Sequence, residues 1–217
     1  MSPGINYKVE KFFSQFPLRS YPKGQILIHA GDNPQYIFFL VKGRVRQYDI
    51  SYRGDEVIVN IFDDHSFFPM LWATTQVSNK YFYDAEIDSE VRLIPYQTLI
   101  TYLKANPDVL YDLLTRLYVG VDGLMGRMVH LMSGSACDRL LYELIEECKR
   151  FGERQKDGSW LVRLNESGLA ARAGLTRETV SRELKKINRD YLLEITRGGI
   201  IVRDLAQLED KLGRARK

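Results

Sequence analysis

The sequence predicts an α+β protein in which an antiparallel β-roll is followed by one long α-helix and by a small helical domain that carries a β-hairpin. Three observations lead to this fold class. Short β-branched and aromatic runs fill residues 20–95, an apolar heptad pattern follows them, and two capped helices with a Gly-Gly turn come last. We therefore divide the chain into three parts, residues 1–106, 107–132 and 133–217.

The first part contains several short runs of β-branched and aromatic residues, and glycines separate them. The strands expected from these runs are Gln25–His29, Tyr36–Val41, Val45–Ile50, Val57–Phe62 and Val91–Pro95. Because no long helical pattern lies between the runs, they predict an antiparallel roll of the jelly-roll type rather than alternating strand–helix–strand units. A roll of this kind can enclose one small ligand.

The second part carries apolar residues at alternating spacings of four and three, which is the a/d pattern of a coiled coil. This seam consists of Leu110, Leu114, Leu117, Val121, Leu124, Met128 and Leu131. The pattern predicts a parallel two-helix coiled coil and therefore a homodimer. The alternative is a single amphipathic helix whose apolar stripe is buried against its own domain.

Three glycines, Gly120, Gly123 and Gly126, interrupt the same helix. Each costs roughly 0.5–1 kcal/mol relative to alanine in a helix interior. The helix is therefore either weak in its middle or closely packed there. In the first case, alanine at both Gly123 and Gly126 should stabilise it by roughly 1–2 kcal/mol.

The third part begins at a boundary formed by Ser133-Gly134-Ser135. We expect Ser135 and Asp138 to cap the following helix, Ala136–Phe151, reciprocally. Gly134 can absorb the dihedral change of a hinge.

Two further helices are bounded by their own capping residues. Asn165 is expected to cap Glu166–Ala173, and Gly174 supplies the positive φ that ends it. Thr176 is expected to cap a second helix over residues 177–189. Its apolar stripe consists of Val180, Leu184 and Ile187, which can pack on the first helix.

The opposite face of this second helix is polar. Its side chains are Arg177, Glu178, Ser181 and Arg182, with Lys185 one turn further on. Arginine forks pair with guanine, and carboxylates accept from cytosine, so these first four residues are candidates to read bases in a DNA major groove. The alternative is an ordinary helical hairpin with a solvated charged face.

A β-hairpin is expected after the second helix, because Leu192–Thr196 and Ile200–Val202 flank Arg197-Gly198-Gly199. The order of helix, turn, helix and hairpin predicts a winged helix-turn-helix that binds double-stranded DNA. Thr176, Lys185 and Arg197 are then candidates for phosphate contacts. Residues 163–203 hold nine Lys or Arg against five Asp or Glu, so the basic excess is localised where DNA would lie.

Three segments together resemble the cAMP receptor protein / fumarate-nitrate regulator (CRP/FNR) family. They are PKGQILIHAGDNPQYIFFLVKGRVRQY, ANPDVLYDLL and LTRETVSRELKKI. The resemblance covers nearly the whole chain. It implies a cyclic-nucleotide-binding-like roll, a dimerising helix, and a winged helix that binds palindromic promoter DNA and contacts RNA polymerase. By the same resemblance, Arg177, Glu178 and Arg182 occupy the base-reading positions, and Arg182 reads a guanine.

The sequence departs from this family at the effector site. In the cAMP-binding branch of the family that this chain resembles, Gly-Glu, Arg-Ser and Thr-Ser pairs surround the nucleotide. The corresponding pairs in this chain are Pro69-Met70, Asn79-Lys80 and Leu124-Met125. The phosphate thus loses its arginine fork, the ribose its carboxylate and the base its hydroxyls. We therefore do not expect cAMP binding.

Aromatic residues dominate the segments that would line the pocket. The candidate lining residues are Phe67, Phe68, Trp72, Lys80, Phe82, Leu124 and Met125. An aromatic cavity with one cation would suit a small hydrophobic or aromatic acid. Two alternatives stand beside this ligand-gated regulator: a constitutive DNA binder whose aromatic residues fill a degenerate pocket, and a regulator that responds to a cyclic nucleotide after all.

Other classes of protein fit the sequence poorly. Two cysteines, Cys137 and Cys148, are too few to hold an iron–sulfur cluster, and the three histidines are too far apart to suggest zinc or haem. A cupin-type enzyme would need clustered metal ligands, so we expect no enzyme activity. With no signal peptide and no apolar run long enough for a membrane span, we expect a cytoplasmic protein.

Overall fold

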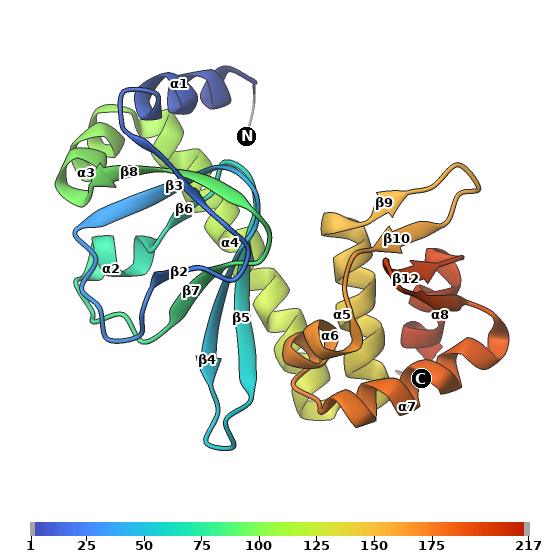
Figure 1. Ribbon diagram of the computed structural model, residues 1–217. Coiled ribbons are helices and arrows are strands. Elements are labelled where there is room, and N and C mark those ends of the chain that lie inside the picture. The colour runs from blue at the N-terminus through green and yellow to red at the C-terminus, as the bar shows by residue number, and fades with distance from the viewer. Residues whose placement is uncertain (1–2, 215–217) are drawn as a thin grey trace. The chain divides into compact units, whose positions relative to one another are not determined.

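The computed structural model describes residues 3–214 and divides into two compact units, one up to Val119 and one from Gly120 onward. The long helix α4 (Pro107–Ser133) contributes its first half to the first unit and its second half to the second (Figure 1).

The first unit is built around two four-stranded antiparallel sheets, which confirms the predicted roll. One sheet has the order β1 (Leu18–Tyr21), β8 (Ser89–Pro95), β3 (Tyr36–Lys42), β6 (Phe67–Phe68). The other has the order β2 (Ile26–Ile28), β7 (Phe82–Ala85), β4 (Val45–Ile50), β5 (Glu56–Phe62). All five predicted strands are present within two residues of their expected ends, whereas β1, β6 and β7 were not expected from the sequence.

Two separate apolar clusters lie on the two faces of the first sheet. Phe38 and Leu40 of β3 point between the sheets and pack with Tyr83 of β7. Ile37 and Phe39 of the same strand point the other way, because side chains alternate along a strand. On that outer face they pack with the start of α4 and with three helices that were not expected from the sequence, α1 (Pro3–Phe13), α2 (Met70–Thr75) and α3 (Tyr96–Ala105).

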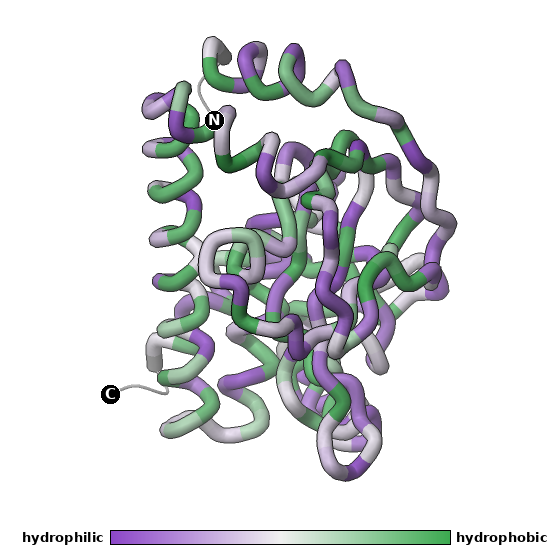
Figure 2. The backbone as a smooth tube through the Cα atoms, turned by 90° about the vertical axis from the view of Figure 1, so that its left-hand side faces the viewer, coloured by the Kyte–Doolittle hydropathy of each residue, from purple (hydrophilic) through white to green (hydrophobic). Residues whose placement is uncertain are grey.

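Hydrophobic and hydrophilic residues are interspersed along the chain rather than gathered in one segment (Figure 2). Accordingly, none of the helices within residues 3–214 is long and apolar enough to cross a membrane.

The predicted seam of α4 is largely exposed in the single chain. Leu117 and Met128 are 60% and 57% exposed, and the other leucines of the seam are more than 40% exposed. Exposed apolar side chains along one stripe are expected if a second helix, rather than the same domain, covers the stripe.

The three glycines of α4 have different surroundings. A Cβ at Gly120 or Gly123 would meet open space, whereas one at Gly126 would lie 2.6 Å from the hydroxyl of Tyr142. That hydroxyl donates a hydrogen bond of 3.0 Å to the carbonyl of Gly123. The expectation that alanine at both Gly123 and Gly126 stabilises the helix is therefore wrong for Gly126, because a methyl group there must displace Tyr142.

The second unit contains α5 (Ala136–Phe151), α6 (Glu166–Ala173), α7 (Arg177–Ile187) and α8 (Leu205–Arg214). They surround one core with a four-stranded sheet of order β11 (Leu193–Thr196), β12 (Gly199–Val202), β10 (Trp160–Val162), β9 (Glu153–Arg154). The predicted hairpin is β11 and β12, and the strands β9 and β10 extend it into a sheet.

The capping residues behave as the sequence predicts. Ser135 and Asp138 form a reciprocal capping box at the start of α5. Asn165 and Thr176 accept hydrogen bonds from backbone amides at the starts of α6 and α7, and Gly174 has a φ of 61°. The helix expected over residues 177–189 ends earlier, because α7 stops at Ile187 and a short 3₁₀ turn, Asn188–Asp190, follows.

Candidate nucleic-acid interface

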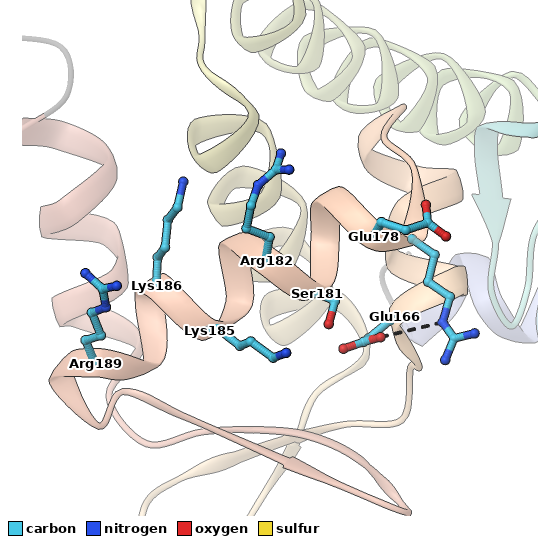
Figure 3. Close-up of a pocket in the computed structure, with 8 residues that line it drawn as sticks. Glu166, Glu178, Ser181, Arg182, Lys185, Lys186 and Arg189 are labelled. Atoms are coloured by element: carbon cyan, nitrogen blue, oxygen red, sulfur yellow. Dashed lines mark ion pairs between the residues drawn. The ribbon is translucent and has the colours of Figure 1, made fainter.

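The polar face of α7 opens onto a surface groove of about 600 Å³, shown in Figure 3 and called here the recognition groove. Its lining residues are Glu166, Arg177, Glu178, Ser181, Arg182, Lys185, Lys186 and Arg189. All four residues predicted to read bases line it, together with Lys185. Sequence reasoning missed Glu166, Lys186 and Arg189, since these lie at the start of another helix or beyond the turns that carry the recognition pattern.

A second groove of about 550 Å³, the wing groove, lies between the start of α6 and the β11–β12 hairpin. It is lined by residues 163–167, Arg177 and residues 195–200, so Arg197 of the predicted hairpin tip is part of it. Glu166 and Arg177 line both grooves. Thr176 lines neither, and its hydroxyl is used as the cap of α7, where it accepts from the amide of Thr179 at 3.3 Å.

Positive charge prevails in the recognition groove. Five of its eight lining residues are Arg or Lys and two are Glu. Glu178 lies in the first turn of α7, where hydrogen bonding by its own backbone amide and by Thr176 lowers the pKa of its carboxyl. This carboxylate therefore stays ionised and can only accept hydrogen bonds, as recognition of a base amino group requires.

Two cations of the recognition groove share the carboxylate of Glu183. Lys186 Nζ donates to Glu183 Oε1 at 2.8 Å, and Arg182 Nε donates to the same oxygen at 3.4 Å. The Glu183 side chain is 7% exposed, whereas those of Arg182 and Lys186 are more than half exposed. Glu183 thus engages the charged groups of both side chains, although the two side chains remain largely exposed at the surface.

Buried ion pairs connect α6 to the second half of α4 through α5. Arg127 of α4 donates two hydrogen bonds to the carboxylate of Glu143 on α5, at 2.6 and 2.9 Å. One turn later on α5, Glu147 accepts from Arg172 of α6, which also donates to the carbonyl of Gly168 at 3.2 Å. Glu143, Glu147 and Arg172 are each less than 5% exposed.

Burial raises the pKa of Glu143, and Arg127 opposes this shift. A buried carboxylate that must stay ionised depends strongly on its partner. The position of α6 relative to α4 and α5 therefore depends on these pairs as well as on apolar packing.

The roll residues proposed to line an effector pocket lie in different clusters and on different faces of the sheets. Phe67 and Trp72 belong to the cluster on the outer face of the first sheet, and Phe68 points between the sheets. Phe82 stacks on Tyr48 on the face of its sheet opposite to Tyr83. Lys80 is exposed, and Leu124 and Met125, in the second unit, are 42% and 60% exposed.

The space between the sheets contains stacked aromatic rings. Phe68 is fully buried, and its ring centroid lies 5.5 Å from Phe38, 5.6 Å from Tyr83 and 4.9 Å from Phe62. Asn79, at the position of the arginine in the resembled cAMP site, is 7% exposed, and its amide nitrogen donates to the carbonyls of His29 and Tyr81. Both features are those of an interior filled by its own side chains.

No three His, Cys, Asp or Glu side chains of residues 3–214 gather in a way that could hold a metal ion. Cys148 is a buried residue of the core of the second unit, and burial raises the pKa of its thiol to about 12.

Comparison with known proteins assigns both halves of the chain. A model of the cyclic nucleotide-binding domain matches residues 18–106, and a model of the Crp-like helix-turn-helix domain matches residues 138–211. The cAMP-activated global transcriptional regulator CRP of Pasteurella multocida is 24% identical over 203 residues, which are 93% of this chain and 97% of that protein. The global nitrogen regulator of a Synechocystis strain is 26% identical over 201 residues, 89% and 88% of the two chains.

Solved structures share the fold. The c-di-GMP-responsive regulator CLP of Xanthomonas campestris superposes with a TM-score of 0.81 at 18% identity, covering 92% of this chain and 99% of that one. A mutant of CooA from Carboxydothermus hydrogenoformans gives a TM-score of 0.78 at 21% identity, covering 93% and 90%.

Replacing Arg127 by methionine should lower the free energy of unfolding by about 3–5 kcal/mol, because the buried Glu143 carboxylate loses its partner. The pKa of Glu143, already raised, should rise further, so the folded protein retains a proton that the unfolded chain releases. Stability of the variant should therefore fall, relative to wild type, as the pH rises above 4.5. Urea unfolding of the full chain at about pH 5 and about pH 8 measures the difference.

The matched control is Arg127→Met combined with Glu143→Leu, which removes both charges and should recover most of the lost stability. An equal loss of stability at both pH values in the single variant would mean that the carboxylate does not depend on Arg127.

Proposed function

Because this chain belongs to the CRP/FNR family of DNA-binding transcription regulators, we propose that it binds an inverted-repeat promoter site as a homodimer, with α7 of each protomer in the major groove. The observation that carries this proposal is the recognition groove, which gathers Arg177, Glu178, Ser181 and Arg182 on one exposed face. Such a face combines guanine-reading forks with an acceptor for cytosine.

Within this groove Arg182 is the base reader for which the support is strongest. Its side chain is 63% exposed and lies in the middle of α7, where its Nε atom is 3.4 Å from the carboxylate of Glu183. A guanine can replace that weak contact with two hydrogen bonds to O6 and N7. Arg177, Glu178 and Ser181 would read the neighbouring bases.

Phosphate binding is assigned to the cations at the edges of the two grooves. Lys185 and Lys186 follow the base-reading residues on α7, Arg189 lies in the 3₁₀ turn after it, and Arg197 stands at the tip of the hairpin in the wing groove. Phosphate contacts position a protein on DNA without reading sequence. Thr176, at the N-terminus of α7, would add a further phosphate contact.

Dimerisation through α4 rests on its exposed seam. A heptad of apolar residues that stays open in the single chain buries apolar area only when a second helix covers it. Two helices paired in this way would set two recognition helices on one inverted repeat.

The proposal for the roll is that it does not bind cAMP. The stacked rings around Phe68 and the engaged amide of Asn79 support an interior that its own side chains fill. A constitutive DNA binder is therefore favoured, and a regulator gated by another small molecule is the second candidate, since a model of the cyclic nucleotide-binding domain matches residues 18–106. Contact with RNA polymerase and a cytoplasmic location are carried over from the family.

Arg182→Ala should abolish the preference for the specific site, because it removes a bidentate guanine contact worth roughly 1–3 kcal/mol per half-site. The measurement is fluorescence anisotropy with two duplexes, one enriched by the wild-type protein from a randomised library and one with its sequence scrambled. Lys185→Ala is the matched control, expected to weaken both complexes alike. Preservation of the wild-type affinity ratio in Arg182→Ala would refute the assignment of α7.

Leu117→Lys combined with Leu124→Lys should convert the dimer into a monomer, because like charges would face each other across the seam. Sedimentation velocity measures the mass. Val119→Lys combined with Val129→Lys places the same charges on exposed positions of the helix outside the seam and should leave the dimer intact. A dimeric seam variant would show that another surface joins the protomers.

Millimolar cAMP should change neither the melting temperature nor the affinity for the enriched duplex, because a ligand that prefers the native state must raise its midpoint. Calorimetric titration of the full-length protein tests binding directly. Saturable binding at micromolar cAMP would contradict the filled roll.

A further inference from the structure

Glu166 faces the same surface as the base-reading residues, although it belongs to α6 and not to α7 (Figure 3). It is the first residue of α6, directly after the cap Asn165, where a carboxylate is favoured by the helix dipole. That preference explains why a carboxylate is tolerated at this position. It does not explain why the side chain lines two grooves in which, among the described residues, arginine and lysine outnumber carboxylates and Glu178 is the one other acidic lining residue.

The partner of Glu166 is Arg177, the first residue of α7. Glu166 Oε2 lies 3.6 Å from Arg177 Nε, and the two side chains are 21% and 69% exposed. The ion pair thus spans the turn between the two helices. Its length exceeds that of a good hydrogen bond, so the pair can exchange for another partner at little cost.

The geometry of this pair matters for what Arg177 can bind. Glu166 engages the Nε side of the guanidinium, which leaves the two terminal nitrogens to form the fork that matches guanine O6 and N7. A phosphate beside the wing groove would instead draw the whole guanidinium away from α7. Arg177 lines both grooves, so both positions are within its reach.

We propose that Glu166 is a specificity-determining positioning residue, which holds Arg177 over the base edges and opposes its use as a general phosphate ligand. This inference rests on the proposed function of α7 in DNA reading. On a random sequence, Arg177 can gain a phosphate only by leaving Glu166, whose own charge also repels that phosphate. On the specific site, the pair is kept while the fork binds a base.

Neutralising Glu166 should therefore raise the affinity for nonspecific DNA more than the affinity for the specific site. Glu166→Gln keeps the size and the acceptor oxygen of the side chain and removes its charge. We expect its affinity for scrambled duplex to rise roughly three- to tenfold, with a salt dependence steeper by up to about 0.9 per half-site, since each protomer gains one phosphate contact. Affinity for the enriched duplex should change by less, so the ratio of the two affinities falls.

The experiment measures both affinities by fluorescence anisotropy at several salt concentrations for wild type, Glu166→Gln, Arg177→Gln and the double variant. The cycle separates an effect through Arg177 from an effect of charge alone. If Glu166 acts by positioning Arg177, its replacement should have at most half of its effect when Arg177 is already glutamine. An undiminished effect in that background would overturn the proposal.

Glu209→Gln is the control for net charge, because Glu209 of α8 forms an ion pair with Lys149 of α5 in the same unit and lines neither groove. It should leave both affinities unchanged. Failure of the wild type to enrich any sequence would contradict the function proposed for α7. Clear discrimination by the wild type, with the same ratio in Glu166→Gln, would leave that function standing and overturn the role of Glu166.

Discussion

Two carboxylates on successive turns of α5, Glu143 and Glu147, organise the unit that carries the recognition helix. Each is nearly inaccessible to water, and each is matched by an arginine from a different helix, Arg127 of α4 and Arg172 of α6. Unpaired, such charges would cost several kcal/mol. Because apolar packing alone allows helices to slide, these directional pairs fix where α6 and therefore α7 can lie against α5 and the second half of α4.

The long helix α4 meets two further requirements at once. One stripe stays apolar and open along the predicted seam, while the side facing α5 must admit Tyr142 closely enough to bond the carbonyl of Gly123. Gly126 makes this approach possible, since a methyl group there would meet the phenol. Glycine weakens a helix, yet Gly126 allows the close packing of Tyr142. Helix propensity, which is a local quantity, does not predict this tertiary role.

Local signals predicted the parts of this fold that local chemistry determines. Asn165, Thr176 and Gly174 are caps whose partners lie within a turn or so, so their roles could be inferred from spacing. Residues acting across elements were missed, such as Glu166 and Arg189. The roll showed the same limit, because Phe67 and Phe68 are adjacent and aromatic yet belong to different clusters on opposite faces of one sheet.

The recognition groove combines a net positive charge with carboxylates that engage its arginine and lysine side chains. A surface with only lysine and arginine would bind any duplex, and the many random sites of a genome would compete with the specific one. Here Glu183 holds Arg182 and Lys186, and Glu166 holds Arg177, through contacts of 2.8 to 3.6 Å. A base that offers two well-placed acceptors can compensate for such contacts more fully than a single phosphate can. Carboxylates that engage the cations of a basic groove therefore suit a protein that must distinguish sequences.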